Sequence, residues 1–120
     1  MPSMTAYRQG DVVLVPFPFT NLEAEKRRPA VIISADWYNT IKPDVIAAAA
    51  TSSIPNQLER DEMLLKGQDL QTAGFPKETV IKAGKIFTIE QSRIVKPLGR
   101  LSPAIQKRLL DLVGEVFYGA

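Results

Sequence analysis

Arg28 is the side chain in this sequence that is best suited to chemistry on a phosphate. It directly precedes Pro29, which biases the backbone of the arginine toward extended geometry. A guanidinium keeps its charge at ordinary pH, and its planar fork can clamp a phosphate and offset developing negative charge. The alternative is a surface arginine that pairs with Glu23 or Glu25.

The hydroxyl run Thr51-Ser52-Ser53 is the second candidate, because it ends an apolar run over residues 44–50. At the end of a buried strand, the Thr51 hydroxyl could meet a ligand while its methyl group packs. In the alternative interpretation, Thr51 is a β-branched residue at the start of a turn, and Ser52 and Ser53 bond nearby backbone groups.

The residue types that are absent narrow the chemistry further. The chain has no histidine and no cysteine, which excludes a Ser-His-Asp triad, a cysteine nucleophile and a thiolate or histidine zinc site within one chain. Asp11, Glu59, Asp61 and Glu62 could suggest paired carboxylates, but no second cluster is spaced to share a metal with them, so solvated charges are favoured. An enzyme built from this sequence must work with Arg, Lys, Asp, Glu, Thr, Ser or Tyr.

Length and composition are those of a soluble globular protein. We expect the 120 residues to form one domain over 1–120, with 45% hydrophobic and 23% charged residues. No apolar stretch approaches the roughly 20 residues of a membrane span, and the first eight residues lack the apolar core of a signal peptide. A cytoplasmic protein is therefore expected. The net charge of +2 and the pI near 9.0 are compatible with a nucleic-acid partner.

The elements that must position these side chains are mostly strands. Apolar and β-branched runs predict strands over 11–19, 29–35, 44–50, 60–66, 79–89 and 92–101. Gly84 interrupts the fifth run, which predicts a bulged strand or two short ones. A turn or short helix is expected at 36–39, and a connection without regular structure at 67–76. The alanine run 47–50 indicates backbone packed closely against a neighbour.

The best evidence for a helix lies at the C-terminus. Ser102 can cap the helix, Pro103 suits its first position, and Gly119 lies where a helix commonly stops. An apolar stripe at helical spacing predicts a face for the core and a subunit interface; it comprises Ile105, Leu109, Val113, Val116 and Phe117. The predicted fold is therefore mainly β with a C-terminal α-helix, as a small, strongly curved antiparallel sheet or a partly open β-barrel.

Several segments occur in an order that resembles the MazF/PemK family of toxin endoribonucleases. Gly10-Asp11 opens the first strand, Arg28-Pro29 precedes the second and Thr51-Ser52 closes the third. The resemblance continues through residues 85–90 and 98–102, and so covers nearly the whole chain. It implies the fold shared by MazF and the CcdB proteins, and the toxin role of a type II toxin–antitoxin system.

The resemblance also implies the reaction and the partners. The family cleaves single-stranded RNA at selected sequences without a metal or other cofactor. The 2′-hydroxyl attacks the adjacent phosphate, leaving a 2′,3′-cyclic phosphate and a 5′-hydroxyl. The implied partners are single-stranded RNA, a second copy in a homodimer, and a cognate antitoxin that lays an acidic segment across the RNA groove; no membrane is implied.

Carried over residue by residue, the resemblance makes Arg28 and Thr51 the catalytic pair. Arg28 is a poor base, so the acceptor of the 2′-proton stays open. RNA contacts are expected from Phe17, Thr20, Asn21, Lys26, Arg27, Ser52, Ser53 and Lys85. Phe17 could stack on an unpaired base or be buried in the core. Many family members carry Gln where this chain has Lys85, which keeps donors but has no acceptor, so base preference cannot be transferred.

Two rival functions remain open at this point. A non-catalytic gyrase inhibitor similar to CcdB would share the fold, but CcdB proteins carry a Trp near the C-terminus. This chain ends in Phe-Tyr-Gly-Ala at 117–120, and its only Trp is Trp37. The second rival is a degenerate family member that binds RNA without cutting it.

Overall fold

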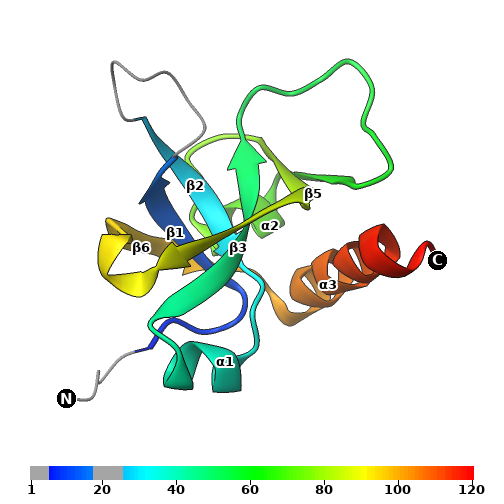
Figure 1. The fold of residues 1–120 in the computed structure, drawn as a ribbon. Coiled ribbons are helices and arrows are strands. Elements are labelled where there is room, and N and C mark those ends of the chain that lie inside the picture. The colour runs from blue at the N-terminus through cyan, green and yellow to red at the C-terminus, as the bar shows by residue number, and fades with distance from the viewer. Residues whose placement is uncertain (1–5, 18–25) are drawn as a thin grey trace.

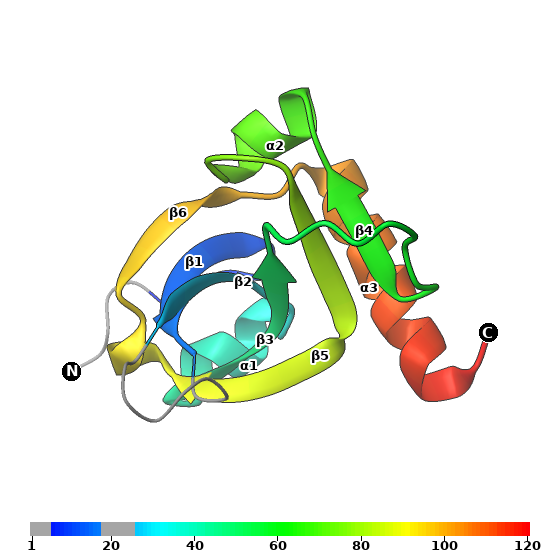
Figure 2. The ribbon, with the colours of Figure 1, turned by 90° about the horizontal axis from the view of Figure 1, so that it is seen from above.

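The computed structural model describes residues 6–17 and 26–120. Six strands in this part of the chain form one antiparallel sheet of order β4-β5-β3-β2-β1-β6. The strands are β1 (Asp11–Pro16), β2 (Arg27–Ile32), β3 (Asp44–Thr51), β4 (Glu62–Leu65), β5 (Thr79–Glu90) and β6 (Lys96–Arg100). The sheet curls strongly along its length (Figures 1 and 2). The predicted fold class is confirmed, and each of the six predicted strands overlaps an observed one.

The C-terminal helix α3 (Pro103–Tyr118) begins and ends where the sequence predicted. The Ser102 hydroxyl accepts a hydrogen bond from the backbone N–H of Ile105 at 3.3 Å, and Gly119 ends the helix with a φ of 84°. Helix α3 packs along the outside of β5 (Figure 2). Two shorter elements are α1 (Asp36–Ile41), which the sequence predicted, and the 3₁₀ turn Gln91–Arg93.

The connection predicted over 67–76 is wrong in part, because it contains the helix α2 (Gln68–Ala73). Gly67 and Gly74 flank this helix with φ values of 64° and 82°. Glycines are typical of loops, but these two enclose a helix of six residues. Such a helix is too short to show a 3.6-residue apolar period.

The two faces of the sheet are covered by separate apolar clusters. The first cluster lies against α2 and α3, and its members include Val12, Val31, Ala48, Ile81 and Leu109. The second lies on the opposite face and includes Val13, Ala30, Ala47, Ala49 and Phe87. The alanine run of β3 thus alternates between two cores, and all four of its side chains are buried. This arrangement confirms the close packing that the sequence predicted.

The bulge predicted at Gly84 is present in β5. Ala50 pairs with Ile81 while Ala48 pairs with Ile86, so residues 82–85 lie opposite the single residue Ala49. Because of the bulge, odd-numbered residues of β5 lie on one face of the sheet before the bulge and on the opposite face after it. Ile81 and Ala83 belong to the cluster beneath α3, whereas Phe87 and Ile89 belong to the opposite cluster.

Asp61 holds this bulge from the turn before β4. Its backbone carbonyl accepts a hydrogen bond from the Ala83 N–H at 2.8 Å, and its Oδ2 accepts one from the Gly84 N–H at 3.2 Å. A Cβ on Gly84 would lie 2.7 Å from that carboxylate oxygen. Glycine is therefore the residue that lets the carboxylate approach the bulge closely.

The C-terminal stripe divides into two parts. Ile105 and Leu109 are buried in the core, as predicted, whereas Val116 and Phe117 are 45% and 69% exposed. The second part of the stripe is thus left uncovered by the described residues. None of the helices in the described chain is long and apolar enough to cross a membrane.

Candidate functional site

Arg28 and Thr51 meet at one end of the sheet, where β2 begins and β3 ends. The ladder between these strands pairs Ala30 with Ala49 and Val31 with Ala48. The same register, continued by two residues, places Arg28 opposite Thr51 and on the face of Ala30 and Ala49. Both residues line a cavity of about 270 Å³, whose other walls are Phe17, Ala49, Ala50, Lys82 and Lys85.

Within the described part of the chain, the Arg28 guanidinium is held by packing and forms no ion pair. Its Cζ lies 5.5 Å from the centroid of the Phe17 ring. Its Nε is buried and has no hydrogen-bond partner among the described residues. Buried donors in folded proteins are nearly always paired, so this N–H in a cavity wall is placed to bind a ligand or a water molecule. Glu23 and Glu25, the alternative partners considered for this arginine, lie outside the described residues.

The Phe17 ring contacts two cations of the site, Arg28 and Lys85. The Lys85 Nζ lies 5.6 Å from the centroid of the same ring, and the ring meets Phe87 edge-on at 5.9 Å. Phe17 is only 6% exposed and belongs to the core beneath the cavity. Of the two roles considered for Phe17, the structure therefore shows core burial. The ring fixes the Arg28 and Lys85 side chains next to the cavity.

Thr51 combines the two interpretations given for it. Its Oγ1 accepts a hydrogen bond from the backbone N–H of Ser53 at 3.1 Å, which is the expected turn. An oxygen that accepts this bond keeps its own O–H for donation. Because Thr51 also lines the cavity, that proton is available to a ligand oxygen. Ser52 and Ser53 are exposed, and neither contributes to the cavity wall.

Lys82 is a member of the site that sequence reasoning missed. In a regular strand, Lys82 and Lys85 would face opposite sides because they are three residues apart. The bulge between them brings both side chains to the same cavity. The Lys82 Nζ lies 3.8 Å from Glu62 Oε2 on the adjacent strand β4. The signal that could have found it is Gly84, which already predicted a bulge between the two lysines.

The remaining predicted RNA contacts lie near the cavity or outside the described residues. Lys26 and Arg27 are exposed at the start of β2, next to Arg28, and alternation along the strand turns Arg27 to the other face. Neither belongs to the cavity wall. Thr20 and Asn21 fall in the segment that the structure does not describe.

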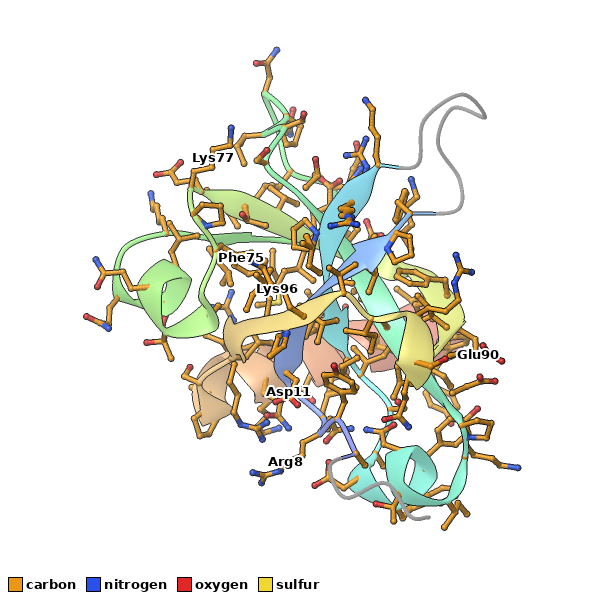
Figure 3. The ribbon with its side chains drawn as sticks, turned by 90° about the vertical axis from the view of Figure 1, so that its left-hand side faces the viewer. Arg8, Asp11, Phe75, Lys77, Glu90 and Lys96 are labelled. Atoms are coloured by element: carbon orange, nitrogen blue, oxygen red, sulfur yellow. The ribbon has the colours of Figure 1, made fainter. Side chains whose placement is uncertain are left out.

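The acidic residues do not form a metal site in the described part of the chain. No group of three or more carboxylates there could hold a metal ion. Asp11 forms a 2.6 Å ion pair with Arg100 and lies four residues from Val15, the partner of Arg28, which is about 13 Å along the strand. Figure 3 shows Asp11 in the lower half of the molecule, whereas β2 begins at the top (Figure 1).

The described walls of the cavity thus carry three cations and one hydroxyl, without a carboxylate. Such a set can bind an anion, donate hydrogen bonds to it and offset additional negative charge. It supplies no strong proton acceptor. The chemistry that fits best is therefore binding and activation of a phosphate.

Comparison with known protein families gives one match that spans most of the chain. Residues 8–117 match the family described as PemK-like, MazF-like toxin of type II toxin–antitoxin system. The comparison with curated proteins found no match.

Solved structures with a similar fold include several toxins. MazF from Deinococcus radiodurans is 20% identical, with a TM-score of 0.73, and the alignment covers 94% of this chain and 97% of that one. An endoribonuclease from a Mycobacterial species, in complex with its cognate antitoxin, is 18% identical with a TM-score of 0.73; coverage is 93% and 95%. The MazE–MazF complex from Deinococcus radiodurans is 19% identical with a TM-score of 0.74, and coverage is 94% and 97%.

Proposed function

The chain belongs to the PemK-like, MazF-like toxins of type II toxin–antitoxin systems, and we propose that it is an endoribonuclease that cleaves single-stranded RNA with Arg28 and Thr51. The observation that carries this proposal is the cavity in which a buried, unpaired guanidinium N–H and a free threonine O–H come together. The names of similar solved structures, which include endoribonucleases, agree with it.

The proposed reaction is an internal transfer within the RNA strand. The 2′-oxygen forms a bond to the adjacent phosphorus, and the bond from phosphorus to the 5′-oxygen of the next nucleotide breaks. The 2′-proton passes to water and the 5′-oxygen takes up a proton, so the products are a 2′,3′-cyclic phosphate and a 5′-hydroxyl. The protein contributes to this step mainly by aligning the reacting atoms and by stabilising the developing charge, rather than by covalent chemistry.

Arg28 and Thr51 have distinct roles in this mechanism. Arg28 donates hydrogen bonds to the non-bridging phosphate oxygens, where negative charge accumulates in the transition state. Thr51 donates its O–H to a phosphate oxygen while its own oxygen stays fixed by the Ser53 N–H. A single positioned donor of this kind is worth about 10²- to 10³-fold in rate.

We propose that the reaction proceeds without a metal or cofactor. The support is the chemistry of the donor set: the described walls of the cavity carry no carboxylate, and the chain has no histidine or cysteine. Lysine and arginine repel a divalent cation and at the same time supply the positive charge that it would bring.

The proposed partners are RNA, an antitoxin and a second copy of the chain. The cations of the cavity are complementary to RNA and equally to an acidic antitoxin segment, which would block the site. The uncovered Val116 and Phe117 of α3 are suited to a subunit interface. Because the proposed substrate is RNA, we place the activity in the cytoplasm.

The test is cleavage of a long, mixed-sequence, single-stranded RNA in the presence of EDTA, with the product ends mapped. The wild type is expected to make discrete cuts that carry 2′,3′-cyclic phosphate, and Arg28→Ala is expected to lose them. Arg108→Ala, at an exposed position on α3, is the matched control and should cut normally. A folded wild type that leaves the RNA intact would contradict the proposal and favour a binding or gyrase-directed role.

A further inference from the structure

Lys82 has an unusual position among the cations of the cavity. Arg28 and Lys85 pack on the Phe17 ring, whereas the only interaction of the Lys82 ammonium with described residues is its contact with Glu62. At 3.8 Å this contact is an ion pair without a hydrogen bond. All three ammonium protons of Lys82 are therefore available to a ligand within the described site.

The partner carboxylate differs from an ordinary surface glutamate. The Glu62 side chain is 9% exposed, and its Oε1 accepts a hydrogen bond from the backbone N–H of Glu59 at 2.8 Å. This bond holds Glu62 in place independently of Lys82. The Lys82 side chain is 35% exposed and lines the cavity. Glu62 therefore keeps a hydrogen bond when Lys82 moves away, whereas the Lys82 ammonium has no second partner among the described residues.

The arrangement of strands separates Lys82 from Arg28 across the cavity. Thr51 lies on β3, between Arg28 on β2 and Lys82 on β5. Two strand spacings place β5 about 10 Å from β2. Arg28 and Thr51 are adjacent and suit a single phosphate, whereas Lys82 extends the positive wall beyond Thr51 toward β4.

We propose that Lys82 binds the RNA phosphate that neighbours the cleaved one, and that it exchanges the Glu62 carboxylate for this phosphate when RNA enters. This inference rests on the proposed function for the identity of the cleaved phosphate. Lys82 then binds the RNA strand and sets its register in the site, while Arg28 and Thr51 act on the phosphate that is cleaved. Glu62 competes with the RNA phosphate for Lys82 and thereby lowers the affinity of the site for RNA.

The first experiment measures binding alone, with a short mixed-sequence RNA that carries 2′-fluoro groups and so has no attacking hydroxyl. Lys82→Met removes the ammonium but keeps the apolar stem, and Lys42→Met, at the exposed end of α1, is the charge-matched control. At low salt we expect about tenfold weaker binding for Lys82→Met. The slope of log affinity against log salt should decrease by about 0.7, the value for one contact to a single strand. Equal behaviour of the two variants would overturn the proposal.

The second experiment identifies the phosphate. Once the cleaved bond is mapped, each flanking phosphate is replaced in turn by a neutral methylphosphonate. For the wild type, one replacement next to the cleaved bond should weaken binding; for Lys82→Met, the same replacement should have no further effect. If Lys82→Met instead lowers the cleavage rate at saturating RNA with unchanged affinity, the lysine acts at the cleaved phosphate and the flanking contact is refuted.

Glu62→Gln provides a test that does not depend on removing the lysine. The amide oxygen can still accept the Glu59 N–H, but the negative charge beside Lys82 is gone. RNA should bind more tightly to this variant, by about threefold, and unchanged binding would contradict the competition. A wild type that binds RNA without cutting it overturns only the nuclease proposal, because the affinity comparisons still hold. A wild type that binds no RNA overturns both.

Discussion

Replacing Asp61 by alanine or by asparagine separates two roles of one side chain. Asp61 carries a negative charge in a pocket beside α3, and its Oδ2 accepts the Gly84 N–H within the bulge of β5. Both substitutions remove the charge, but only alanine removes the acceptor. The second tie, from the Ala83 N–H to the Asp61 carbonyl at 2.8 Å, belongs to the backbone and is kept in both variants.

The expected loss of stability follows from the geometry of the bond. At 3.2 Å and in contact with solvent, it belongs to the weaker hydrogen bonds, even though its acceptor is charged. We expect Asp61→Ala to lower the free energy of unfolding by about 1 kcal/mol. For a chain of this length, that corresponds to a melting temperature lower by about 3–5 °C. Asp61→Asn should stay within about 0.5 kcal/mol of the wild type.

The consequence for RNA follows from the lysines that the bulge orients. Lys82 and Lys85 face the same cavity only because residues 82–85 are bulged opposite Ala49. Asp61→Ala loosens this segment, and we expect RNA affinity to decrease by about three- to tenfold. Asp61→Asn keeps an acceptor for the Gly84 N–H and so keeps the bulge, and its RNA affinity should equal that of the wild type.

The assays are urea unfolding, RNA binding, and hydrogen exchange at the Gly84 amide. Faster exchange at Gly84 in Asp61→Ala, but not in Asp61→Asn, would show that the side-chain acceptor protects this amide. If the two variants lose equal stability and bind RNA equally well, the carboxylate does not hold the bulge, and the reasoning is refuted.

Substitutions at three further positions test other parts of the structure. Arg28→Lys keeps the positive charge but loses the planar fork, so we expect cleavage about 10²-fold slower with unchanged folding; a normal rate would mean that charge alone suffices. Gly99→Ala would place a Cβ against the carbonyl group of Ala73, which is backbone and cannot swing away. We expect a loss of about 3 kcal/mol in urea unfolding, and an unchanged midpoint would contradict this close approach. Ser102→Ala removes the hydroxyl that caps α3 and should cost about 1 kcal/mol, whereas Ser102→Asp should restore it; both are measured by thermal unfolding.

The fold could be predicted because its signals are local and agree with one another, whereas the Arg28–Thr51 pair was predicted from the resemblance to the MazF/PemK family. Runs of β-branched residues mark the interior strands, although the second strand begins at Arg27, two residues before the predicted start at Pro29. Strands that follow one another along the chain usually pair. The start of β2 and the end of β3 therefore meet, which brings Arg28 to Thr51.

The features that could not be predicted depend on contacts between distant segments. Helix α2 is stabilised by its glycine ends and by packing of Ala73 against the core, and neither leaves a periodic pattern in six residues. Burial of Phe17 depends on Phe87, which is seventy positions away and reaches it only after the face of β5 has changed. The alternation of side chains between the two faces of a strand does not predict which residues of two distant strands will meet.

Lys82 shows why residue-by-residue comparison with a family is insufficient for this site. The position matching a frequent glutamine holds Lys85, and the bulge adds a second lysine to the same wall. Both side chains donate hydrogen bonds and accept none, so they suit phosphate oxygens and base-edge acceptors, but they cannot pair with donor groups on a base. If the proposed function holds, the cations in the described part of the cavity suit the charge and spacing of an RNA backbone. Selection of a base through its donor groups must then come from residues other than these cations.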